Sequence, residues 1–462
     1  MIIEMIKGGL RVGFFGLGIS NRSLISNLPL EKCEITLRSD TDIACGDIPS
    51  EIVPKRIFCG KDCCKEINED IIFFSPSVRR DRPDLISAEA NGVIFSSDAE
   101  LFFEENNKKL LLVSGSDGKS TTAALIHHLL SKAGYKSRLI GNIGEPLTEH
   151  LYCEADYFVI ELSSFMLSYL KPASEAACIT NITQNHLDWH KDFEEYKRVK
   201  LSIFNNAKRA VISDRYEYND RAFAVISGDS DFYELSKKRN AELYFTLEKG
   251  YICKNSRKII GIDEINRKEK HNIKNLMMAM AMTEGLVDVS DVISVAKGFL
   301  GLSHRCEAVL SEGGVEYIDS SIDSTPARTA QTLESLGRQA VLILGGRSKG
   351  VDYKELVPTL RKYVKLAVIT GENSEEIFNA IKNDVNAEIR ADFEEAILLG
   401  KRYAKDVGLL LLSPASTSFD RFKNYAHRGD KFREILQKSI DNENKSLQNI
   451  EETRKNGETN LS

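Results

Sequence analysis

The sequence predicts an α/β protein of three domains with largely parallel sheets, and three observations support this. The chain has 462 residues, too many for one hydrophobic core. Hydrophobic residues make up 42% and charged residues 28% of it, close to globular averages, which excludes collagen-like and wholly disordered chains. Short apolar runs that end in turn residues recur at helix-length spacing, which is the rhythm of βαβ units.

The apolar runs fall into three series. The first predicts strands at Val12–Phe15, Ile71–Phe74 and Val93–Phe95. The second predicts strands at Leu110–Val113, Tyr157–Ile160, Ala177–Ile179 and Val211–Ser213. The third predicts strands at Tyr317–Ile318, Val341–Leu344, Ala367–Thr370 and Leu409–Leu412. We therefore expect domains over residues 1–107, 108–302 and 303–440.

Helices are predicted between these strands. A helix over Ser120–Ala133 repeats apolar residues on one face and is closed by Gly134. A second amphipathic segment covers Thr329–Leu336. Residues 441–462 are polar, with many Asn, Glu and Lys residues and little to bury, so we predict a disordered tail.

Composition also narrows the partners and the compartment. Lys and Arg total 62 against 68 Asp and Glu, so no basic field favours nucleic acid or an anionic membrane. Nine cysteines without a small-domain framework predict reduced thiols in the cytoplasm. The tightest cluster, Cys59, Cys63 and Cys64, has no second Cys/His pair at zinc-like spacing, so we expect no metal there. We expect neither a signal peptide nor a membrane span.

The strongest local signal is LLLVSGSDGKSTT at residues 110–122, a strand that runs through a glycine turn into a helix. Backbone N–H groups from Gly115 through Ser116, Asp117, Gly118 and Lys119 can hold a phosphate chain, and the Ser120 hydroxyl can bind Mg²⁺. The strict Walker pattern fails by one glycine, because its first glycine would fall on Val113. A surface turn that caps a helix is the alternative interpretation.

The N-terminal segment Gly16-Leu-Gly18-Ile-Ser-Asn21 follows a predicted strand and approximates the dinucleotide-binding fingerprint, with Asp40 about one βαβ step further on. Asn21 stands where the third glycine is expected. A close strand–helix turn without a ligand explains the pattern about as well. We interpret the segment as a candidate pyrophosphate site and not as proof of NAD binding.

Three polar segments stand at or beside predicted strand ends, where open α/β sheets bind ligands: residues 141–144, 161–165 and 181–188. Glu161 and His186 are candidate Mg²⁺ ligands. Considered one at a time, these residues have simpler interpretations that fit equally well. Glu161 could be a solvated glutamate, and His186 and His190 could be two surface imidazoles. Lys200 alone would be a solvated charge on a helix.

Taken together, the motifs resemble the ATP-dependent Mur ligase family over nearly the whole chain except the tail. They occur in family order: GLGISN, SGSDGKSTT, GNIGEP, IELSSFML, TNITQNHLDWH with Lys200, HNIKN, HRCE, YIDSSIDSTP, LGGRSKG and SPASTSFDRFKNYAHRG. The first and last of these resemble the D-glutamate-adding branch. The resemblance implies a Rossmann-like N-terminal domain for a UDP-linked substrate, a central P-loop ATPase domain, and a C-terminal Rossmann-like domain for the amino acid and nucleotide.

The resemblance also implies a reaction. ATP would phosphorylate the carboxylate of UDP-N-acetylmuramoyl-L-alanine, and the amine of D-glutamate would attack the acyl phosphate to form an amide, in cytoplasmic peptidoglycan precursor synthesis. Cations must neutralise the contact between the two anions. The implied cations are Lys119 and two Mg²⁺ ions, one on Ser120 and Glu161 and the other on His186 and a carbamylated Lys200. We also expect a monomer.

Further site residues are implied by motif position only. The implied catalytic residues are Lys119, His186, Lys200 and Lys349. The implied nucleotide-binding residues are Gly115, Ser116, Asp117, Gly118, Lys119, Ser120, Thr121, Asn272, Arg305 and Asp319. Asn142 approaches the bound substrate, and the uridine end has Ser20, Ser39 and Ser75. The implied contacts of D-glutamate are Lys349, Ser418, Phe419 and Tyr425.

The chain departs from the family pattern at three places. The phosphate loop reads Ser-Asp-Gly instead of Thr-Asn-Gly, residues 320–324 read Ser-Ser-Ile-Asp-Ser instead of Ser-Lys-Ala-Thr-Asn, and Arg347 replaces an acidic residue. Asp323 receives no role. Three alternatives stay open: a sister ligase with another acceptor, a non-catalytic nucleotide-binding relative, and a simple NTPase.

Overall fold

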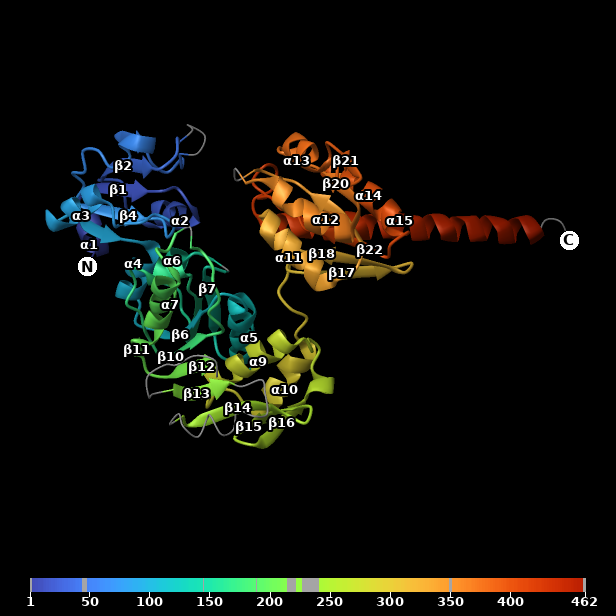
Figure 1. Ribbon diagram of the computed structural model, residues 1–462, viewed down its shortest axis with the longest axis horizontal. Coiled ribbons are helices and arrows are strands. Elements are labelled where there is room, and N and C mark those ends of the chain that lie inside the picture. Colours follow the sequence, from blue (N-terminus) through green and yellow to red (C-terminus); the bar gives the residue numbers. More distant parts are fainter. Residues whose placement is uncertain are drawn as a thin grey trace. The chain divides into compact units, whose positions relative to one another are not determined.

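The computed structural model describes residues 2–43, 48–143, 145–187, 189–213, 222–226, 241–348 and 351–459. It divides into two compact units, Met1–Phe299 and Leu300–Ser462, which are described separately (Figure 1). The first unit contains two main sheets and the second unit contains one. These three sheets correspond to the three predicted series of strands, and the predicted fold class is confirmed. The bounds of the domains stay predictions.

The first sheet is five-stranded and wholly parallel, with the order β3-β2-β1-β4-β5. Its strands are β1 (Arg11–Phe15), β2 (Glu34–Ser39), β3 (Arg56–Cys59), β4 (Ile71–Phe74) and β5 (Ile94–Ser96). The helices of this region are α1 (Ile2–Lys7), α2 (Ile19–Asn27), α3 (Pro83–Ala90), α4 (Asp98–Glu105) and the short η2 (Gly60–Asp62). Apolar clusters cover both faces, which explains why β1 and β4 are continuous apolar runs.

The central sheet has nine strands in the order β16-β15-β14-β13-β12-β10-β6-β8-β7, antiparallel only from β14 to β16. Its strands are β6 (Lys109–Ser114), β7 (Ser137–Gly141), β8 (Tyr157–Glu161), β10 (Ala176–Ile179), β12 (Ala210–Ser213), β13 (Ala222–Ile226), β14 (Leu243–Glu248), β15 (Tyr251–Lys254) and β16 (Arg257–Gly261). A small separate sheet pairs β9 (Ala173–Ser174) with β11 (Asn206–Ala207). The helices are α5 (Lys119–Lys132), η3 (Leu147–His150), α6 (Ser164–Leu167), α7 (Phe193–Leu201), η4 (Ser202–Phe204), η6 (Ile262–Glu264), α9 (Lys270–Met282) and α10 (Val289–Gly298).

The second unit has a six-stranded sheet in the order β17-β18-β22-β19-β20-β21, parallel except for the hairpin of β17 and β18. The strands are β17 (Glu307–Glu312), β18 (Val315–Asp319), β19 (Ala340–Leu344), β20 (Val364–Ile369), β21 (Ala387–Ile389) and β22 (Leu409–Leu412). The helices are α11 (Pro326–Leu336), η7 (Tyr353–Leu356), α12 (Val357–Tyr363), α13 (Ser374–Ile381), α14 (Phe393–Ala404) and α15 (Tyr425–Thr459).

Helix α15 includes residues 441–459 of the stretch that the sequence predicts to be a disordered tail (Figure 1). Phe432, Leu436 and Ile440 bury the first part of this helix, and Ile440 is the last buried apolar residue described on it. Glu, Lys and Gln are good helix formers, so local propensity favours the helix beyond the packed part.

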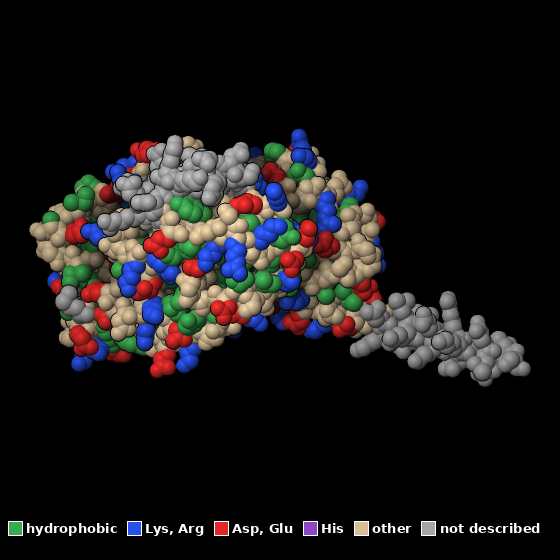
Figure 2. Space-filling model, turned by 90° about the horizontal axis from the view of Figure 1, so that it is seen from below, with side chains coloured by type: hydrophobic (Ala, Val, Ile, Leu, Met, Phe, Trp, Pro, Cys, Tyr) green, Lys and Arg blue, Asp and Glu red, His purple; other side chains and the backbone are tan. Residues whose placement is uncertain are grey.

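Among the described residues, no helix is both long enough and apolar enough to cross a membrane. Figure 2 shows Lys and Arg side chains alternating with Asp and Glu side chains across the face it presents. This mixture agrees with the small net charge of −6.

Candidate active site

The predicted phosphate loop lies between β6 and α5, and two of its glycines are required by close contacts. Gly115 has a φ of +144°, and a Cβ atom there would lie 2.0 Å from the Thr180 hydroxyl oxygen. Gly118 has a φ of +78°, and a Cβ atom there would lie 2.5 Å from Oδ1 of Asn275. Larger residues would displace the loop, so these glycines serve the close packing of its backbone.

The segment after β10 holds the loop in place. The N–H groups of Ser116 and Asp117 donate to Asn181, at 2.9 Å to its carbonyl oxygen and 2.8 Å to Oδ1. The Ser116 hydroxyl also lies 2.8 Å from the hydroxyl of Tyr196. Two of the five N–H groups predicted to hold phosphate are thus already bonded to the protein. Lys119 stands at the start of α5, and its ammonium donates to the Ser116 carbonyl at 2.7 Å.

Glu161 ends β8, beside the phosphate loop, and is almost completely buried. Its Oε1 accepts a hydrogen bond from Nδ2 of Asn142 at 2.7 Å. Its Oε2 is buried and has no hydrogen-bond partner. A buried carboxylate oxygen without a donor is unfavourable in a protein interior. The structure therefore leaves Oε2 available for a cation, at the end of a strand that packs against α5, the helix whose first turn contains Ser120 and Thr121.

Lys200 lies on α7 and is buried beside the same strands, with 2% of its surface exposed. Its ammonium donates to the Ser114 hydroxyl at 3.3 Å and lies over the ring of Tyr196. Burial, followed by the nearby charge of Lys119, holds the pKa of Lys200 well below its usual value. Lys200 is therefore not the solvated helix charge that its sequence alone would suggest.

The two histidines of the 181–190 segment have different surroundings. His186 is exposed and has a φ of +54°, and its ring packs edge-on against Phe165. His190 is buried, and burial lowers its pKa despite Glu195, whose Oε1 is 3.5 Å from Nδ1. The interpretation of two surface imidazoles is therefore wrong for His190.

The N-terminal glycine segment lies at the carboxyl edge of the first sheet, where β1, β2 and β4 end together. The Ser75 hydroxyl donates to the Gly16 carbonyl at 3.0 Å, and the Ser20 hydroxyl bonds to the buried carboxyl of Asp98. Ser39 is the last residue of β2. The three predicted uridine-end serines thus lie along one sheet edge.

Asn21 explains why the third glycine of the fingerprint is absent. Its side-chain amide is fully buried and donates to the carbonyl groups of Phe15, Gly16 and Phe73. It therefore links the ends of β1 and β4 from within. The residue has a structural role, and it gives no support to an NAD site.

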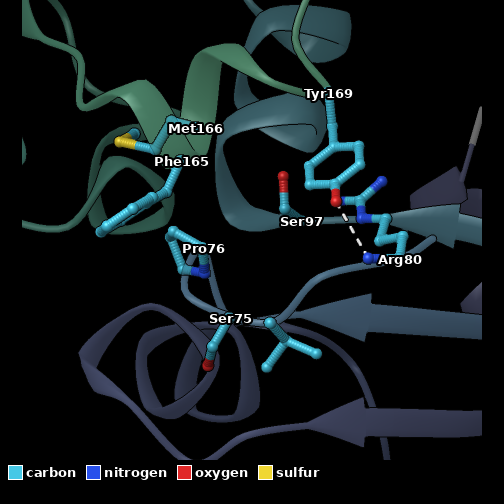
Figure 3. A pocket seen from close by; sticks show the side chains of 8 residues that line it. Ser75, Pro76, Arg80, Ser97, Phe165, Met166 and Tyr169 are labelled. Carbon is cyan, nitrogen blue, oxygen red and sulfur yellow. Dashed lines mark hydrogen bonds between the residues drawn. The ribbon is translucent and has the colours of Figure 1, made fainter. Parts of the chain in front are cut away.

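A small pocket joins this sheet edge to α6 within the first unit (Figure 3). Its lining residues are Ser75, Pro76, Val78, Arg80, Ser97, Phe165, Met166 and Tyr169. The N–H group of Arg80 donates to the Tyr169 hydroxyl at 2.9 Å, and its guanidinium lies over the rings of Tyr169 and Phe74. Ser75 thus belongs to a pocket that the central domain helps to line.

Asn272 lies in the first turn of α9, the helix whose Asn275 contacts the phosphate loop. Its side-chain amide donates to Glu269 at 3.0 Å, and 8% of its surface is exposed. Because α9 packs along α5, Asn272 lies on the same side of the sheet as the loop.

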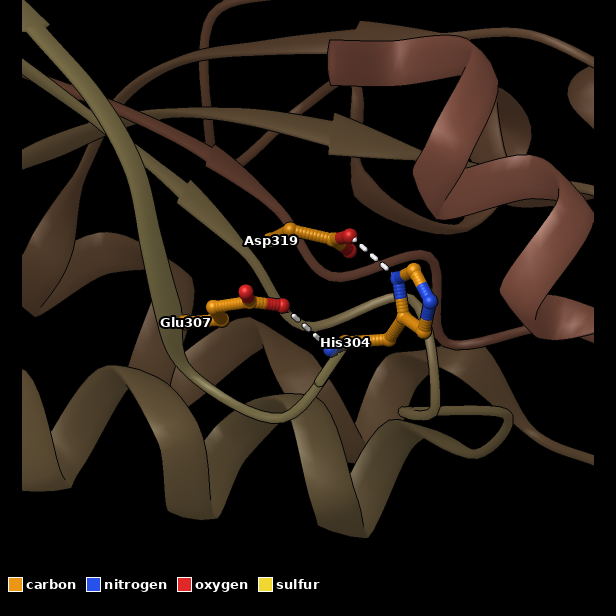
Figure 4. Close-up of side chains that lie close together, drawn as sticks. All are labelled: His304, Glu307 and Asp319. Atoms are coloured by element: carbon orange, nitrogen blue, oxygen red, sulfur yellow. Dashed lines mark hydrogen bonds and ion pairs between the residues drawn. The ribbon is translucent and has the colours of Figure 1, made fainter. Parts of the chain in front are cut away.

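In the second unit, Asp319 is the last residue of β18 and is fully buried. Its oxygens accept from Nδ1 of His304 at 2.7 Å and from the N–H group of Ser321 at 2.8 Å (Figure 4). Burial opposes protonation of His304, but the hydrogen bond to Asp319 and the negative charges of Asp319, Asp430 and Glu307 together outweigh it and raise the histidine pKa. His304, Glu307 and Asp319 are the one set of three metal-type ligands in the described part of the chain. Arg305, between them, is exposed.

The residues predicted to contact D-glutamate lie around the ends of β19 and β22. Ser418 is buried, Phe419 is 49% exposed, and the ring of Tyr425 is 6.2 Å from that of His304. Lys349 lies outside the described residues. The guanidinium of Arg347 pairs with Glu372 at 3.0 Å, which gives this departure from the family pattern a local partner.

In the altered loop at residues 320–324, the carboxyl group of Asp323 has hydrogen-bond partners within the second unit. Asp323 is buried and accepts hydrogen bonds from the hydroxyls of Ser413 and Thr332, each at 2.8 Å. Burial raises its pKa. Asp323 therefore ties the loop to β22 and α11.

Sequence reasoning missed Arg428, although it stands inside a quoted motif. Its buried guanidinium donates to Ser321 and to the carbonyl groups of Gly345, Ser416 and Thr417. Burial lowers its pKa to about 10. The arginine joins three loops at the carboxyl edge of the sheet. The arginine beside Gly429 in the quoted motif was the available signal, but its contacts span more than 100 residues of sequence.

Comparisons with known proteins agree with this architecture. Residues 113–283 match the Mur ligase middle domain and residues 304–416 match the Mur ligase glutamate ligase domain. The chain is 35% identical, over 92% of its own length and 96% of the relative, to a UDP-N-acetylmuramoylalanine--D-glutamate ligase of Ruminiclostridium cellulolyticum. It is 32% identical over the same shares to the protein of that name from Clostridium tetani.

A solved structure of similar fold is the UDP-N-acetylmuramate-alanine ligase MurC of Thermotoga maritima, with a TM-score of 0.54 and 16% identity over 93% of this chain and 100% of that one. At this identity the likeness supports the fold alone. The relatives share a third of this sequence across nearly its whole length, and both matched domains are in the predicted order. The chain therefore belongs to the Mur ligase family.

Proposed function

We propose that this chain joins D-glutamate to the carboxylate of UDP-N-acetylmuramoyl-L-alanine and converts ATP to ADP and phosphate in the process. The names of the relatives, which align over 96% of their length, support the two substrates. The observation that carries the proposal is a buried carboxylate and a buried amine, Glu161 and Lys200, beside a phosphate loop. A protein that only binds nucleotide has no use for this second cluster.

ATP would bind at the start of α5. Residues Gly115 to Thr121 would surround its phosphates, and the Lys119 ammonium would exchange its bond with the Ser116 carbonyl for one with a phosphate. Asn272 lies on the adjacent helix α9 and would contact the nucleotide from that side. Arg305 is exposed and is the proposed contact from the second unit. Asp319 would act mainly by holding His304 and the following turn, because both of its oxygens are bonded.

The residues present fit Mg²⁺. The unpartnered Oε2 of Glu161 offers a buried oxygen ligand, and the Ser120 hydroxyl in the first turn of α5 offers a second. Bound there, Mg²⁺ would neutralise charge between the γ-phosphate and the substrate carboxylate. We assign a second ion to His186 and Lys200, and this assignment requires modification of Lys200.

Carbamylation would convert the Lys200 amine into an anionic oxygen ligand. The reaction needs a neutral amine, and the lowered pKa of Lys200 favours that form. The buried Ser114 hydroxyl and the Tyr196 ring would position the product.

The remaining contacts follow from the sheet edges. Ser20, Ser39 and Ser75 would bind the uridine nucleotide at the carboxyl edge of the first sheet, and Asn142 would contact the substrate beside Glu161. In the second unit, Ser418, Phe419, Tyr425 and Lys349 would bind D-glutamate. The amine of D-glutamate would then attack the carbonyl carbon of the acyl phosphate, and phosphate would leave.

Phosphate release by the purified protein tests the proposal. The assay contains ATP, Mg²⁺ and UDP-N-acetylmuramoyl-L-alanine, with D-glutamate, L-glutamate, another amino acid or none, and the product mass is measured. We expect turnover that requires both the uridine substrate and D-glutamate. Turnover with a different acceptor or amino acid would indicate a sister ligase, and phosphate release without any acceptor would indicate a simple NTPase.

A further inference from the structure

Two neighbouring thiols lie at the edge of the first sheet. Cys63 and Cys64 follow η2, and their sulfur atoms are 3.8 Å apart. Nη1 of Arg82 lies 3.4 Å from the Cys63 sulfur and 3.8 Å from the Cys64 sulfur. The Cys63 thiol donates to Oδ1 of Asp40 at 3.5 Å, and the same Asp40 forms two hydrogen bonds with Arg82.

Hydrogen bonds from Arg38 hold the backbone that carries the two thiols. This arginine is fully buried, pairs with Glu69 at 2.7 Å, and donates to the carbonyl groups of Cys63 and Lys65. The sulfurs therefore face each other on a fixed turn.

The two thiols differ in exposure. Cys63 is buried and Cys64 is partly exposed. Burial and the neighbouring Cys64 sulfur raise the pKa of Cys63 to about 11. The Cys64 thiol is therefore the more accessible to solvent, and it lies next to the positive charge of Arg82. The Cys63 thiol is buried and stays protonated.

We propose that Cys63 and Cys64 form a reactive dithiol that a low-molecular-weight disulfide oxidises to one intramolecular disulfide. The Cys64 thiol loses its proton, its sulfur attacks the external disulfide, and one external thiol leaves. The Cys63 sulfur then attacks the Cys64 sulfur of the mixed disulfide, and its proton goes to the second departing thiol. The protein loses two hydrogen atoms, and the external disulfide becomes two thiols.

The product is expected to be easily reduced. Adjacent Cα atoms are about 3.8 Å apart, below the roughly 4.4–6.8 Å of ordinary disulfides, so the ring is strained. Strained disulfides have more oxidising potentials and serve as labile sites. Closure would also remove the thiol that donates to Asp40, the residue after Ser39. If the proposed function holds, oxidation should then weaken binding of the uridine substrate.

Peptide mapping tests the dithiol without any need for turnover. The reduced full-length protein is incubated with oxidised glutathione, its remaining thiols are alkylated, and it is digested with trypsin. We expect the peptide Asp62–Lys65 to lose two hydrogen atoms, and mild reduction to restore it. Glutathione on both cysteines, no modification, or a bridge from Cys64 to Cys59 on the separate peptide Ile57–Lys61 would overturn the proposal.

Matched variants identify the order of the steps. Cys63→Ser should accumulate a Cys64–glutathione adduct, Cys64→Ser should leave Cys63 unmodified, and Cys59→Ser should behave as the parent protein. A Cys63 adduct in the Cys64→Ser protein that forms as fast as the parent reaction would contradict the order. Binding of UDP-N-acetylmuramoyl-L-alanine is then compared between the oxidised and reduced protein. Equal affinities would overturn the link to the nucleotide end, whereas absent binding in both forms would instead count against the proposed function.

Discussion

At the residue scale, the unpartnered Oε2 of Glu161 has the most direct chemical consequence. We predict that Glu161→Gln lowers kcat by about 10²–10³-fold, the usual effect of removing one group that organises charge at a reaction centre. The half-saturating Mg²⁺ concentration should rise as well, because an amide is a weaker ligand than a carboxylate. Steady-state kinetics over a Mg²⁺ titration would measure both. Glu175→Gln is the control and should leave both values unchanged, because Glu175 is a partly exposed glutamate of the same unit that pairs with Lys208.

Lys200 allows a separate test of its modification. If its buried amine is carbamylated, protein equilibrated with ¹³C-labelled bicarbonate should show one carbamate resonance, and Lys200→Met should lack it. The variant should also lose ligase activity by about 10²-fold or more, because it cannot provide the oxygen ligand. A resonance that survives in Lys200→Met would place the carbamate elsewhere. A parent protein that is fully active without the resonance would contradict this role of Lys200.

Asp98 gives a prediction about stability and pH. Burial raises its pKa to about 6, and one of its oxygens has no hydrogen-bond partner. The folded state then binds a proton more tightly than the unfolded state, so Asp98 destabilises the fold increasingly as the pH rises from about 4 to about 6. The cost reaches about 3 kcal/mol at pH 8 and is roughly half of that at pH 5. Asp98→Asn should therefore raise the free energy of unfolding more at pH 8 than at pH 5, which denaturant unfolding at the two pH values would measure. An equal gain at both would show that Asp98 does not titrate in this range.

At the scale of elements, the two ends of α5 provide a matched pair of substitutions. Gly115→Ala places a Cβ atom 2.0 Å from the Thr180 hydroxyl and should weaken ATP binding by tenfold or more, at least about 1.4 kcal/mol. Gly134→Ala, at the other end, has a φ of +88° and open space around the new atom. It should cost about 1 kcal/mol of stability and leave ATP affinity unchanged. Calorimetric titration with ATP would compare them, and equal losses of affinity would contradict the steric argument.

The elements also show what the sequence can and cannot predict. The buried parallel strands, such as β6 and β19, and the helix α5 were predictable because an apolar run and a glycine stop are local signals. The short edge strands β3 and β21 were missed because half-buried edges carry a weaker apolar pattern.

Site residues also divide into those that a local motif predicts and those that only the fold brings together. The position of Lys119 follows from its motif, but the burial of Lys200 does not, since α7 reads as a charged helix. The hydrogen bonds of Asn181 to the phosphate loop and of Arg428 to three loops join distant segments. No spacing along the chain indicates them.

At the scale of the whole molecule, the chain divides after Phe299 into units with separate apolar cores. A unit with its own core is expected to fold alone. We therefore predict that a fragment of residues 1–299 folds and binds ATP with Mg²⁺, because the phosphate loop, Glu161, Lys200 and Asn272 all lie within it. It should not ligate D-glutamate, because the proposed amino-acid contacts lie in residues 300–462.

Circular dichroism and thermal unfolding of both fragments, with and without ATP, would test this division. ATP should raise the melting temperature of the 1–299 fragment, since a ligand that binds only the folded state stabilises it, and should leave the 300–462 fragment unchanged. Lys119→Ala in the 1–299 fragment is the control and should greatly reduce the shift. A fragment that stays unfolded would show that the two cores depend on each other. Full ligase activity from residues 1–299 alone would show that the D-glutamate site does not lie in residues 300–462.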